Sequence, residues 1–554
     1  MNIILNNQKI EVNDEMTVLE LCRKQGIFVP TLCYLRGVTE DGNCRTCLVE
    51  VNGKIKTSCS TAISDGMVIV TNSPKVEKMR KTNIELIISN HNFDCEHCGK
   101  QGKCDLQKLA ILYNIDPTKY AGDKHSLGID DSSLCIVKDH SKCIHCGRCI
   151  EICNQLHGLN VYGKNHRGFD SNISPAFLRG IGDTACIGCG QCVLVCPTGA
   201  LMERTNMDEV TKIIKETKIK VIAQVAPSVR VALGEEFGSK MGKNVEAKIP
   251  TALRLLGFDE VYDVNVGADL TSVEEAKELI ERKRNGGVLP LFTSCCPAWY
   301  KYVLDSASEF VPNLSTCLSP NEMLASLVKY KAEKVGEKVK IVSIMPCTAK
   351  KYELAKDKGT DYSLTTREIG YLLRRNGIDL NELEDSEFDN PFADYSGSGV
   401  IFGKSGGVME SAIRSAIRLL TGKEITSVQS VQESEGVLVT EVKAGEIVLR
   451  VAVVYGINNA KQILERIKEG EHFDFVEVMA CPKGCINGGG QPYVDRNEVT
   501  VEDIAKTRGK SLTDIAKIKN VKNSYNSEVV QKVFSDISAE KLHQLLHHKL
   551  GDEK

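Results

Sequence analysis

The sequence lacks an excess of charge of either sign. Its 70 Lys and Arg residues nearly balance 73 Asp and Glu residues, which gives a formal net charge of −3. The start, MNIILNNQKIEV, lacks the basic flank and apolar core of a secretory signal, and no segment approaches the ~18 uncharged apolar residues that span a bilayer. These absences argue against a nucleic-acid partner, a membrane partner and export. We therefore expect a cytoplasmic protein.

Cysteine, in contrast, is abundant. The chain of 554 residues is too long for one hydrophobic core, so its length predicts roughly three to four domains. Most of the 23 cysteines fall before Cys295, in clusters spaced by two or three residues, which favours metal ligation over disulfide pairing. A secreted, disulfide-rich protein fits neither this length nor the missing signal peptide. Zinc is the stronger rival to iron–sulfur clusters, because C-x-x-C pairs bind it too.

Residues 1–77 are expected to form a small α+β domain. Two apolar runs around an Asn-Asn turn predict a hairpin, residues 17–26 predict a capped helix, and VEVNGKIKTS predicts a strand pair. The domain resembles a plant-type [2Fe–2S] ferredoxin, although ten residues separate its first two candidate ligands, unlike the compact C-x4-C-x2-C pattern. Cys22, on the helix, is expected to be a buried core thiol. The candidate ligands are Cys33, Cys44, Cys47 and Cys59.

Residues 78–125 offer three thiols and an imidazole within one helix end and loop. Cys₃His is a common structural zinc set, so spacing alone favours zinc over a [4Fe–4S] cluster. The iron–sulfur modules expected on either side favour a cluster instead. His97 is a competing imidazole. The candidate ligands are His91, Cys95, Cys98 and Cys104.

Residues 126–208 carry the run C-x2-C-x2-C-x3-C twice. This is the pattern of bacterial two-[4Fe–4S] ferredoxins, in which the fourth cysteine of each run ligates the other cluster. Pro197 follows the second run as the pattern expects, whereas Asn154 replaces that proline after the first. One cluster is therefore expected on Cys143, Cys146, Cys149 and Cys196, and the other on Cys153, Cys186, Cys189 and Cys192.

From about residue 209 to residue 554, cysteines become sparse and β-rich runs alternate with amphipathic helical stretches. The runs IKVIAQVAP, VLPLFTS and VKIVSIMP each lead into a motif with proline or cysteine. Ligands gather at the carboxyl ends of strands in open α/β folds, so these ends are expected to converge on one site. The predicted fold is thus multidomain α+β and α/β, with small ferredoxin-like modules before a large α/β domain. Residues after about 500 are expected to be helices that wrap this domain, with the His pair of AEKLHQLLHHKL on the surface.

Three segments of the large domain carry its remaining informative cysteines: TSCCPAW at 293–299, MPCTAKKYE at 345–353 and VMACPKGCINGGGQP at 478–492. They resemble the three signature segments of the [FeFe]-hydrogenases. The upstream modules resemble those of the long, monomeric, clostridial-type form, so the likeness covers essentially the whole chain. The resemblance also favours His91 as the ligand of the second module.

The resemblance implies an H-cluster, in which a [4Fe–4S] cube is bridged by Cys485 to a di-iron subsite with CO, cyanide and a dithiolate amine. Lys350 would hydrogen-bond one cyanide, and Ala226, Pro227 and Ser228 would contact the other. Pro320, Met345, Phe402 and Met479 are expected to pack around the irons. Gly488, Gly489 and Gly490 would allow close backbone approach or positive φ. The cube's expected ligands are Cys296, Cys347, Cys481 and Cys485.

An enclosed metal site needs a proton supply. Glu275, Glu278 and Arg282 recur at i, i+3 and i+7 and so share one helical face, which by itself is more typical of a solvated surface. The resemblance implies a proton route in the order Arg282, Glu278, Ser315, Glu275, Cys295. Of the other thiols, Cys135 and Cys317 receive no role, and Cys317 is expected to be a buried spectator.

The resemblance further implies the reaction 2 H⁺ + 2 e⁻ ⇌ H₂, with electrons from a ferredoxin or flavodoxin-like carrier. One [2Fe–2S] and three accessory [4Fe–4S] clusters would conduct them, and hydrogenase maturation factors would be partners. Asn321 stands where the family usually has glutamine, and Lys483 where it usually has glycine. These departures put rate, direction and oxygen response in doubt. The alternatives are a non-catalytic iron–sulfur assembly relative, a redox sensor and an electron-transfer subunit of a larger complex.

Overall fold

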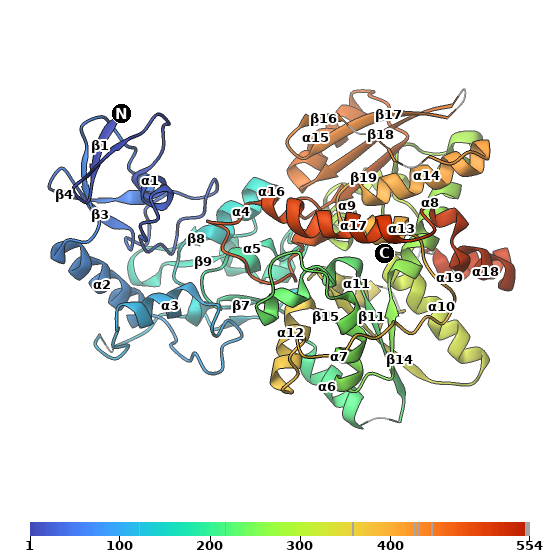
Figure 1. The fold of residues 1–554 in the computed structure, drawn as a ribbon, viewed down its shortest axis with the longest axis horizontal. Helices are drawn as coiled ribbons and strands as arrows, with labels where there is room; N and C mark the ends of the chain where they lie inside the picture. Colours follow the sequence, from blue (N-terminus) through green and yellow to red (C-terminus); the bar gives the residue numbers. More distant parts are fainter. Residues whose placement is uncertain are drawn as a thin grey trace.

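The computed structural model forms a smaller lobe from the first part of the chain and a larger lobe from the remainder (Figure 1). Small α+β units in the first lobe and parallel sheets with helices in the second confirm the multidomain fold class expected from the sequence. The structure describes residues 1–120, 122–216, 218–356, 359–425, 427–428, 431–444 and 447–548.

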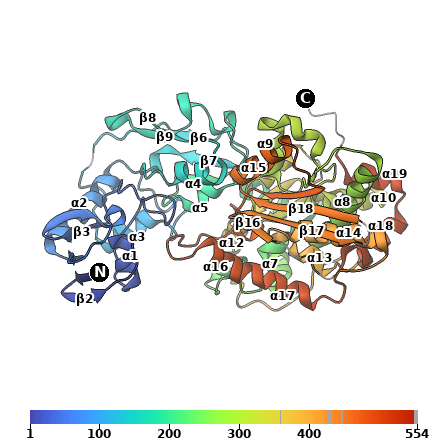
Figure 2. The same cartoon turned by 90° about the horizontal axis from the view of Figure 1, so that it is seen from above.

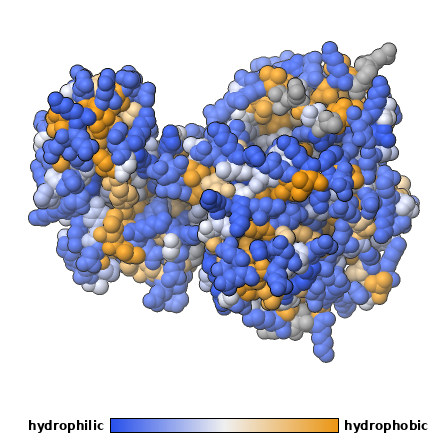
Figure 3. All heavy atoms as spheres, viewed as in Figure 1, coloured by the Kyte–Doolittle hydropathy of each residue, from blue (hydrophilic) through white to orange (hydrophobic). Residues whose placement is uncertain are grey.

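The surface fits the balanced composition of the chain. Figure 3 shows a mostly hydrophilic face, with hydrophobic side chains gathered in small patches over both lobes. Among the helices in the described ranges, none is both long enough and apolar enough to cross a membrane.

The amino-terminal sheet has the strand order β2-β1-β5-β3-β4. The antiparallel pairs β1 with β2 and β3 with β4 confirm the predicted hairpin and strand pair. Helix α1 (Val18–Lys24) starts with a capping box between Thr17 and Glu20, a device typically worth about 1 kcal/mol. The strands are β1 (Asn2–Leu5), β2 (Gln8–Glu11), β3 (Leu48–Val51), β4 (Lys54–Thr57) and β5 (Val68–Val70).

Two helices, α2 (Pro74–Ser89) and α3 (Asp105–Leu112), carry the second module. Ser73 caps α2, and Pro74 occupies its first turn, where a missing N–H costs nothing. His91 lies just beyond the end of α2, and Cys104 caps α3 by accepting a hydrogen bond from Gln107 N. The helix ends therefore position the first and the last of the four candidate ligands.

The third module repeats one local design. Helix α4 (Arg148–His157) and helix α5 (Gln191–Val195) each follow a glycine in the left-handed region, Gly147 at φ 86° and Gly190 at φ 73°. A glycine adopts this conformation without steric cost, so each cysteine run can turn sharply into its helix. The strands are β6 (Ile129–Asp130), β7 (Ile136–Asp139), β8 (Gly163–Asn165), β9 (Asn172–Ser174) and β10 (Leu201–Glu203).

The large lobe contains a parallel sheet with the order β12-β11-β14-β15. Helices α7 and α12 pack on it, as does α10, which Ser319 caps. The strands are β11 (Lys220–Val225), β12 (Glu260–Asp263), β14 (Val339–Met345) and β15 (Tyr362–Thr365). The helices of this region are α6 (Met207–Glu216), α7 (Ile249–Leu256), α8 (Asn265–Asn285), α10 (Pro320–Lys334), α11 (Lys350–Lys356) and α12 (Thr366–Arg375).

A second sheet, of order β13-β19-β18-β17-β16, is parallel over its first three strands and antiparallel beyond. Along β18, Val451 and Val453 pack with helix α14, while Ala452 and Val454 pack with α9 and α15. Alternate side chains thus bury both faces of the strand. The strands are β13 (Leu291–Phe292), β16 (Val431–Ser434), β17 (Val437–Ala444), β18 (Ile447–Tyr455) and β19 (Phe475–Met479). The helices are α9 (Pro297–Ser306), α13 (Gly397–Val400), α14 (Gly407–Thr421) and α15 (Ile457–Lys468).

The carboxyl-terminal helices run along the large lobe, as the sequence predicts (Figures 1 and 2). They are α16 (Val501–Ile504), α17 (Lys510–Ile518), α18 (Glu528–Asp536) and α19 (Ala539–Leu546). The end of α19 pairs with the segment before α10, because Leu318 N donates to Leu546 O and His548 N donates to Thr316 O. Residues 549–554, the last part of the predicted wrap, lie outside the described residues.

This pairing corrects one expectation. The sequence placed the His547-His548 pair on the surface, but the His547 side chain is only 7% exposed. The strand-like pairing with residues 316–318 turns it inward, where Thr316 and Glu274 bond its two ring nitrogens. His548 stacks on Tyr300 and is half-buried.

Candidate active site

The carboxyl ends of four parallel strands open onto one cavity of about 90 Å³. Strand β11 leads into Ala226 and Pro227, β14 into Pro346 and Cys347, β19 into Ala480 and Cys481, and β13 into the segment with Cys295 and Cys296. The predicted convergence of strand ends is therefore confirmed. The expected residues that line this cavity are Ala226, Pro227, Ser228, Cys295, Cys296, Pro320, Met345, Cys347, Lys350, Phe402, Met479, Cys481 and Cys485.

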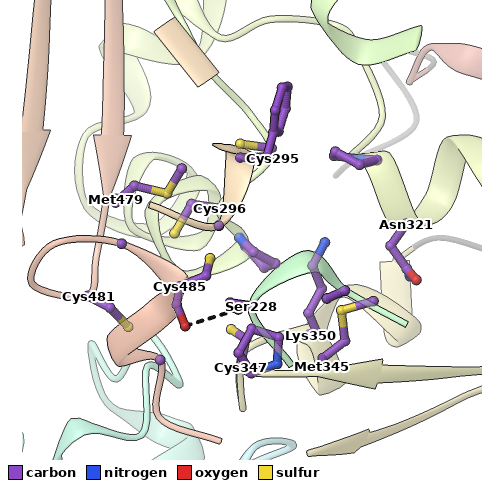
Figure 4. A pocket seen from close by; sticks show the side chains of 18 of the residues that line it. Ser228, Cys295, Cys296, Asn321, Met345, Cys347, Lys350, Met479, Cys481 and Cys485 are labelled. Carbon is purple, nitrogen blue, oxygen red and sulfur yellow. Dashed lines mark hydrogen bonds between the residues drawn. The ribbon is translucent and has the colours of Figure 1, made fainter. Parts of the chain in front are cut away.

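Four thiols surround the same space: Cys296, Cys347, Cys481 and Cys485 (Figure 4). Burial raises the pKa of each, so these thiols ionise readily only next to a strong positive charge such as bound iron. No cysteine of the described chain forms a disulfide. Ala480 N lies 3.5 Å from the Sγ of Cys296, a backbone donor aimed at a sulfur. The donor set fits an iron–sulfur cube.

Lys350 supplies the cavity's positive charge. Its Nζ lies 2.7 Å from both carboxylate oxygens of Glu353 and 2.8 Å from Ser319 Oγ. Burial, the largest effect, lowers the pKa of Lys350, but Glu353 and then Glu322 and Cys347 together outweigh it, so the pKa is raised. The ammonium group is thus held charged and in a fixed position at the cavity wall.

Backbone and hydroxyl groups form another polar part of the wall. Ser228 Oγ donates to Cys485 O at 3.3 Å, and Gln491 Nε2 donates to both Ser228 O at 3.1 Å and Cys485 O at 3.3 Å. This network ties the VAPSVR turn to the third signature segment. Apolar side chains complete the enclosure, with Phe402 and Met479 packed in one cluster beside Cys295 and Cys296.

Asn321 also faces the cavity. Its Nδ2 donates to Glu322 Oε1 at 2.9 Å and to Thr360 Oγ1 at 2.8 Å, whereas its buried Oδ1 has no hydrogen-bond partner in the described chain. One buried acceptor of Asn321 is therefore available beside the cavity.

Lys483 adopts φ 62°, the left-handed region that favours glycine. This explains why glycine suits the position. The lysine side chain points away over the ring of Tyr455, at 5.3 Å, and towards Glu502, at 3.6 Å. Lys483 is therefore not among the residues that line the cavity.

The three glycines 488–490 are packed against other backbone. A Cβ on Gly488 would lie 2.2 Å from Pro346 O, and one on Gly489 would lie 2.1 Å from Cys189 O. A Cβ on Gly490 would lie 3.0 Å from Cys347 N. The expected close approach is therefore confirmed, but the alternative of positive φ is wrong, since Gly488 has φ −63° and none of the three has positive φ.

Helix α8 carries the expected proton-route residues along one face. Arg282 Nη2 lies 2.6 Å from Glu278 Oε1, and Ser315 Oγ donates to Glu278 Oε2 at 2.7 Å. Glu275 is fully buried, and burial, with Glu278 next, raises its pKa well above the usual range. Burial and then Glu275 likewise raise the pKa of Cys295. Both shifts favour the neutral, protonated form of the inner carboxyl and thiol, and Arg282 stands at the partly exposed end.

The upstream thiols also gather in sets. In the first module, Cys44 N donates to Cys33 Sγ at 3.4 Å, and the sulfurs of Cys47 and Cys59 lie 3.3 Å apart. That separation is far beyond a disulfide bond and suits ligands of one cluster. Cys22 packs in the core of this module, as expected.

In the second module, the structure distinguishes between the two histidines that could serve as the fourth ligand. His91 is buried, and its Nδ1 has no hydrogen-bond partner in the described chain, as a metal ligand requires. Burial lowers the pKa of His91 to about 4, which keeps the ring neutral. His97 is 81% exposed and pairs with Asp94 instead.

The third module joins its two runs as the pattern predicts. Cys143, Cys146 and Cys149 line one small cavity together with Cys196 from the second run. In the other set, burial raises the pKa of Cys192, and the nearby thiols of Cys186 and Cys153 add to the effect. Cys189 belongs to this set and also lines the cavity at the strand ends, so the two sites share a wall.

Sequence reasoning missed two contributors. His157 is fully buried, accepts from Ile457 N at Nδ1, and therefore donates from Nε2 to Cys189 Sγ at 3.3 Å. No spacing signal marks a lone histidine at a helix end. Glu353, the partner of Lys350, lies inside the quoted segment three residues further along the helix, and an i, i+3 charge rule could have found it.

Comparisons with known proteins agree with this geometry. Residues 219–489 match the iron only hydrogenase large subunit, C-terminal domain, and residues 1–74 match a 2Fe-2S iron-sulfur cluster binding domain. Residues 80–119 match the NADH-ubiquinone oxidoreductase-G iron-sulfur binding region, and residues 142–201 match a 4Fe-4S dicluster domain.

The chain is 39% identical to the NADP-reducing hydrogenase subunit HndD of Solidesulfovibrio fructosivorans, over 99% of this chain and 98% of that protein. It is 35% identical to iron hydrogenase 1 of Clostridium pasteurianum, over 99% of each. The solved structure of the [FeFe]-hydrogenase HydA1 from Chlamydomonas reinhardtii superposes with a TM-score of 0.56 and 34% identity, over 62% of this chain and 98% of that one. The fold and the cysteine modules define a multi-cluster iron–sulfur protein. It belongs to the [FeFe]-hydrogenase family, in a long form with upstream iron–sulfur domains.

Proposed function

We propose that this protein catalyses 2 H⁺ + 2 e⁻ ⇌ H₂ at the cavity where the four strand ends meet. The observation that carries the proposal is the joint placement there of four thiols, one buried and three half-buried, one fixed lysine and the thiol of Cys295. A solvated lysine or a buried methionine alone would not indicate a catalytic site. Their common location, at the expected strand ends, fits one catalytic centre.

In this proposal Cys296, Cys347, Cys481 and Cys485 would hold the H-cluster. Bound there, the cluster supplies the metal centre at which protons and electrons combine. Lys350, fixed by Glu353, and the donors around Ser228 would orient the diatomic ligands of the bound cluster. Met345, Phe402, Met479 and Pro320 exclude water.

Protons reach the cavity through residues of α8 and its neighbours. Arg282 holds Glu278 at the outer end, Ser315 donates to Glu278, and Glu275 and Cys295 carry the proton inward. Burial raises the pKa of both inner groups, which favours their protonated forms and suits groups that release one proton as they receive another.

Electrons travel through the upstream modules. The proposed division is 1–77 for one [2Fe–2S] cluster, 78–125 for a [4Fe–4S] cluster with His91, 126–208 for two [4Fe–4S] clusters and 209–554 for the catalytic domain. Cys189 supports the last step, since it stands in the wall between the dicluster module and the cavity. A ferredoxin or flavodoxin-like protein is the proposed carrier, and the NADP-reducing relative makes an NADP-linked partner subunit the alternative to test.

An infrared spectrum of maturated protein, in the metal–CO and metal–cyanide stretching region, tests the proposal. Wild type is expected to show these bands and to evolve H₂ from reduced ferredoxin. A matched Cys485→Ala variant should lose the bands while keeping the electron paramagnetic resonance signals of the upstream clusters. If preparations with full iron content show neither bands nor H₂ formation, the hydrogenase assignment is wrong.

A non-catalytic assembly function is the second candidate. The chain is 28% identical to the cytosolic Fe-S cluster assembly factor narfl of Danio rerio, over 61% of this chain. The enclosed cavity with Cys295, Lys350 and the complete third segment favours catalysis over this alternative.

A further inference from the structure

Three side chains from distant parts of the chain meet beside the outer end of α8. They are Glu278 on the helix, Cys317 in the segment before α10, and His547 in the carboxyl-terminal tail. One potential ligand atom from each lies within 4.8 Å of the other two. We propose that Glu278, Cys317 and His547 form a binding site for a zinc ion.

The distances are close to those of a tetrahedral zinc site. Cys317 Sγ lies 3.8 Å from Glu278 Oε2 and 4.0 Å from His547 Nδ1. Zinc binds sulfur at about 2.3 Å and nitrogen or oxygen at about 2.0–2.2 Å, so neighbouring ligand atoms in a tetrahedron lie roughly 3.3–3.6 Å apart. Small shifts of these side chains would therefore bring the ligand atoms to the spacing of a tetrahedral zinc site.

The orientation of His547 also fits a ligand. Its Nε2 lies 3.1 Å from Glu274 Oε2, and a carboxylate can only accept, so Nε2 carries the ring proton. The lone pair of Nδ1 then faces Thr316, at 2.8 Å, and Cys317. A carboxylate that receives the far N–H of a histidine is the usual second partner in zinc sites, where it fixes the tautomer and strengthens the ligand.

The charges balance around a dication. Zinc binding displaces the thiol proton of Cys317, Zn²⁺ + RSH → Zn–SR⁺ + H⁺, and the Glu278 carboxylate neutralises the remaining charge. Thr316 Oγ1, or a water in its place, can serve as the fourth ligand. The preference for zinc over magnesium or calcium follows from the sulfur and nitrogen donors.

Glu278 links this site to the proposed proton route, and this consequence rests on the proposed function. Ser315 Oγ donates to the same Glu278 oxygen that lies nearest to Cys317. A zinc ion bound to this oxygen would occupy the position through which Glu278 contacts Ser315, so the carboxylate could not serve both. Occupation of the site is therefore expected to slow H₂ evolution at least tenfold, and removal of zinc by EDTA is expected to restore it.

Zinc binding is measured directly on the anaerobic, cluster-loaded protein by equilibrium dialysis against buffered Zn²⁺. Wild type is expected to hold one high-affinity zinc per chain. Cys317→Ala and His547→Ala should abolish it, and Glu274→Gln should weaken it roughly 10–100-fold. His548→Ala is the matched control, since it removes the neighbouring imidazole but should leave binding unchanged. Iron content per chain and circular dichroism report whether each variant is folded.

Zinc X-ray absorption provides a readout independent of activity, because the clusters contain iron. One sulfur ligand with nitrogen and oxygen ligands is expected in wild type. Equal zinc affinity in wild type and in folded Cys317→Ala and His547→Ala variants would refute the site. High-affinity zinc in a protein that lacks hydrogenase activity would uphold the site and refute the proposed function. Normal H₂ evolution with the site filled would refute the inhibitory consequence alone.

Discussion

The imidazole of His157 donates a hydrogen bond from Nε2 to the sulfur of Cys189, across 3.3 Å. The donor is fixed because Nδ1 accepts from Ile457 N. Hydrogen bonds to cluster sulfurs stabilise the reduced, more negative state and so raise the reduction potential. We therefore expect this buried histidine to tune the cluster that Cys189 is proposed to hold.

His157→Ala is therefore expected to lower the reduction potential of the cluster that includes Cys189. A redox titration followed by electron paramagnetic resonance measures it. His166→Ala is the control, since His166 is exposed in the same module. An unchanged potential in folded His157→Ala protein would contradict the assigned role.

Cys295→Ala should reduce H₂ evolution by roughly 10²–10⁴-fold, the range typical for loss of a proton-transfer group. The infrared bands of the cavity should persist, because Cys295 is not an expected iron ligand. Cys22→Ala removes a buried thiol in the first module and should leave turnover unchanged. Full turnover in Cys295→Ala would remove this thiol from the proton route.

Glu278→Gln tests the outer end of the same route. The amide keeps the shape but cannot carry a proton, so turnover is expected to fall about 10²-fold or more. Glu281→Gln changes an exposed residue of the same helix and serves as the control. Similar rates for the two variants, measured with reduced ferredoxin at saturating concentration, would show that protons enter elsewhere.

Lys483→Gly should raise the free energy of unfolding by roughly 1 kcal/mol, because a non-glycine residue at φ 62° is strained. The lost contact with Glu502 is partly exposed and contributes little. Lys483→Ala keeps the strain and removes the contacts, so it should give no such gain. Anaerobic thermal unfolding at one scan rate compares the three proteins. A lower unfolding temperature for the glycine variant would contradict the prediction.

Glu477 gives a pH-dependent prediction. Burial raises its pKa to about 7, while Gly406 N and Met409 N donate to its two oxygens. The folded state binds the Glu477 proton more tightly than the unfolded state does. Protonated Glu477 therefore stabilises the fold fully below about pH 4.5, and this contribution is lost as pH rises through about 7. The full shift corresponds to about 3 kcal/mol.

The unfolding temperatures of wild type and Glu477→Gln are compared between about pH 5 and pH 8 to check this. The advantage of wild type should shrink as pH rises. Glu469→Gln, at an exposed position, should follow wild type throughout. A constant difference between wild type and Glu477→Gln would mean that the carboxyl does not titrate in this range.

Cysteine spacing predicted the modules because three of the four candidate ligands of each cluster in the third module lie close in sequence. The cavity could be predicted from strand ends such as Met345 and Met479, since the ends of parallel strands share an edge. The roles of His157 and His547 could not be predicted, because their hydrogen-bond partners lie about 30 or more residues away in the sequence and no periodic pattern links them. Gly488 illustrates what the sequence can and cannot predict. The close approach of other backbone to this glycine was predictable, but its φ angle was not.

The contact between Gly489 and the carbonyl of Cys189 leaves no room for even one carbon atom. The two lobes therefore meet backbone to backbone here, and the gap that an electron would cross in the proposed route is set by main-chain geometry rather than by side chains that could rearrange. In chimaeras that exchange the first 208 residues between relatives, we expect this fit to persist only where glycine is kept at position 489.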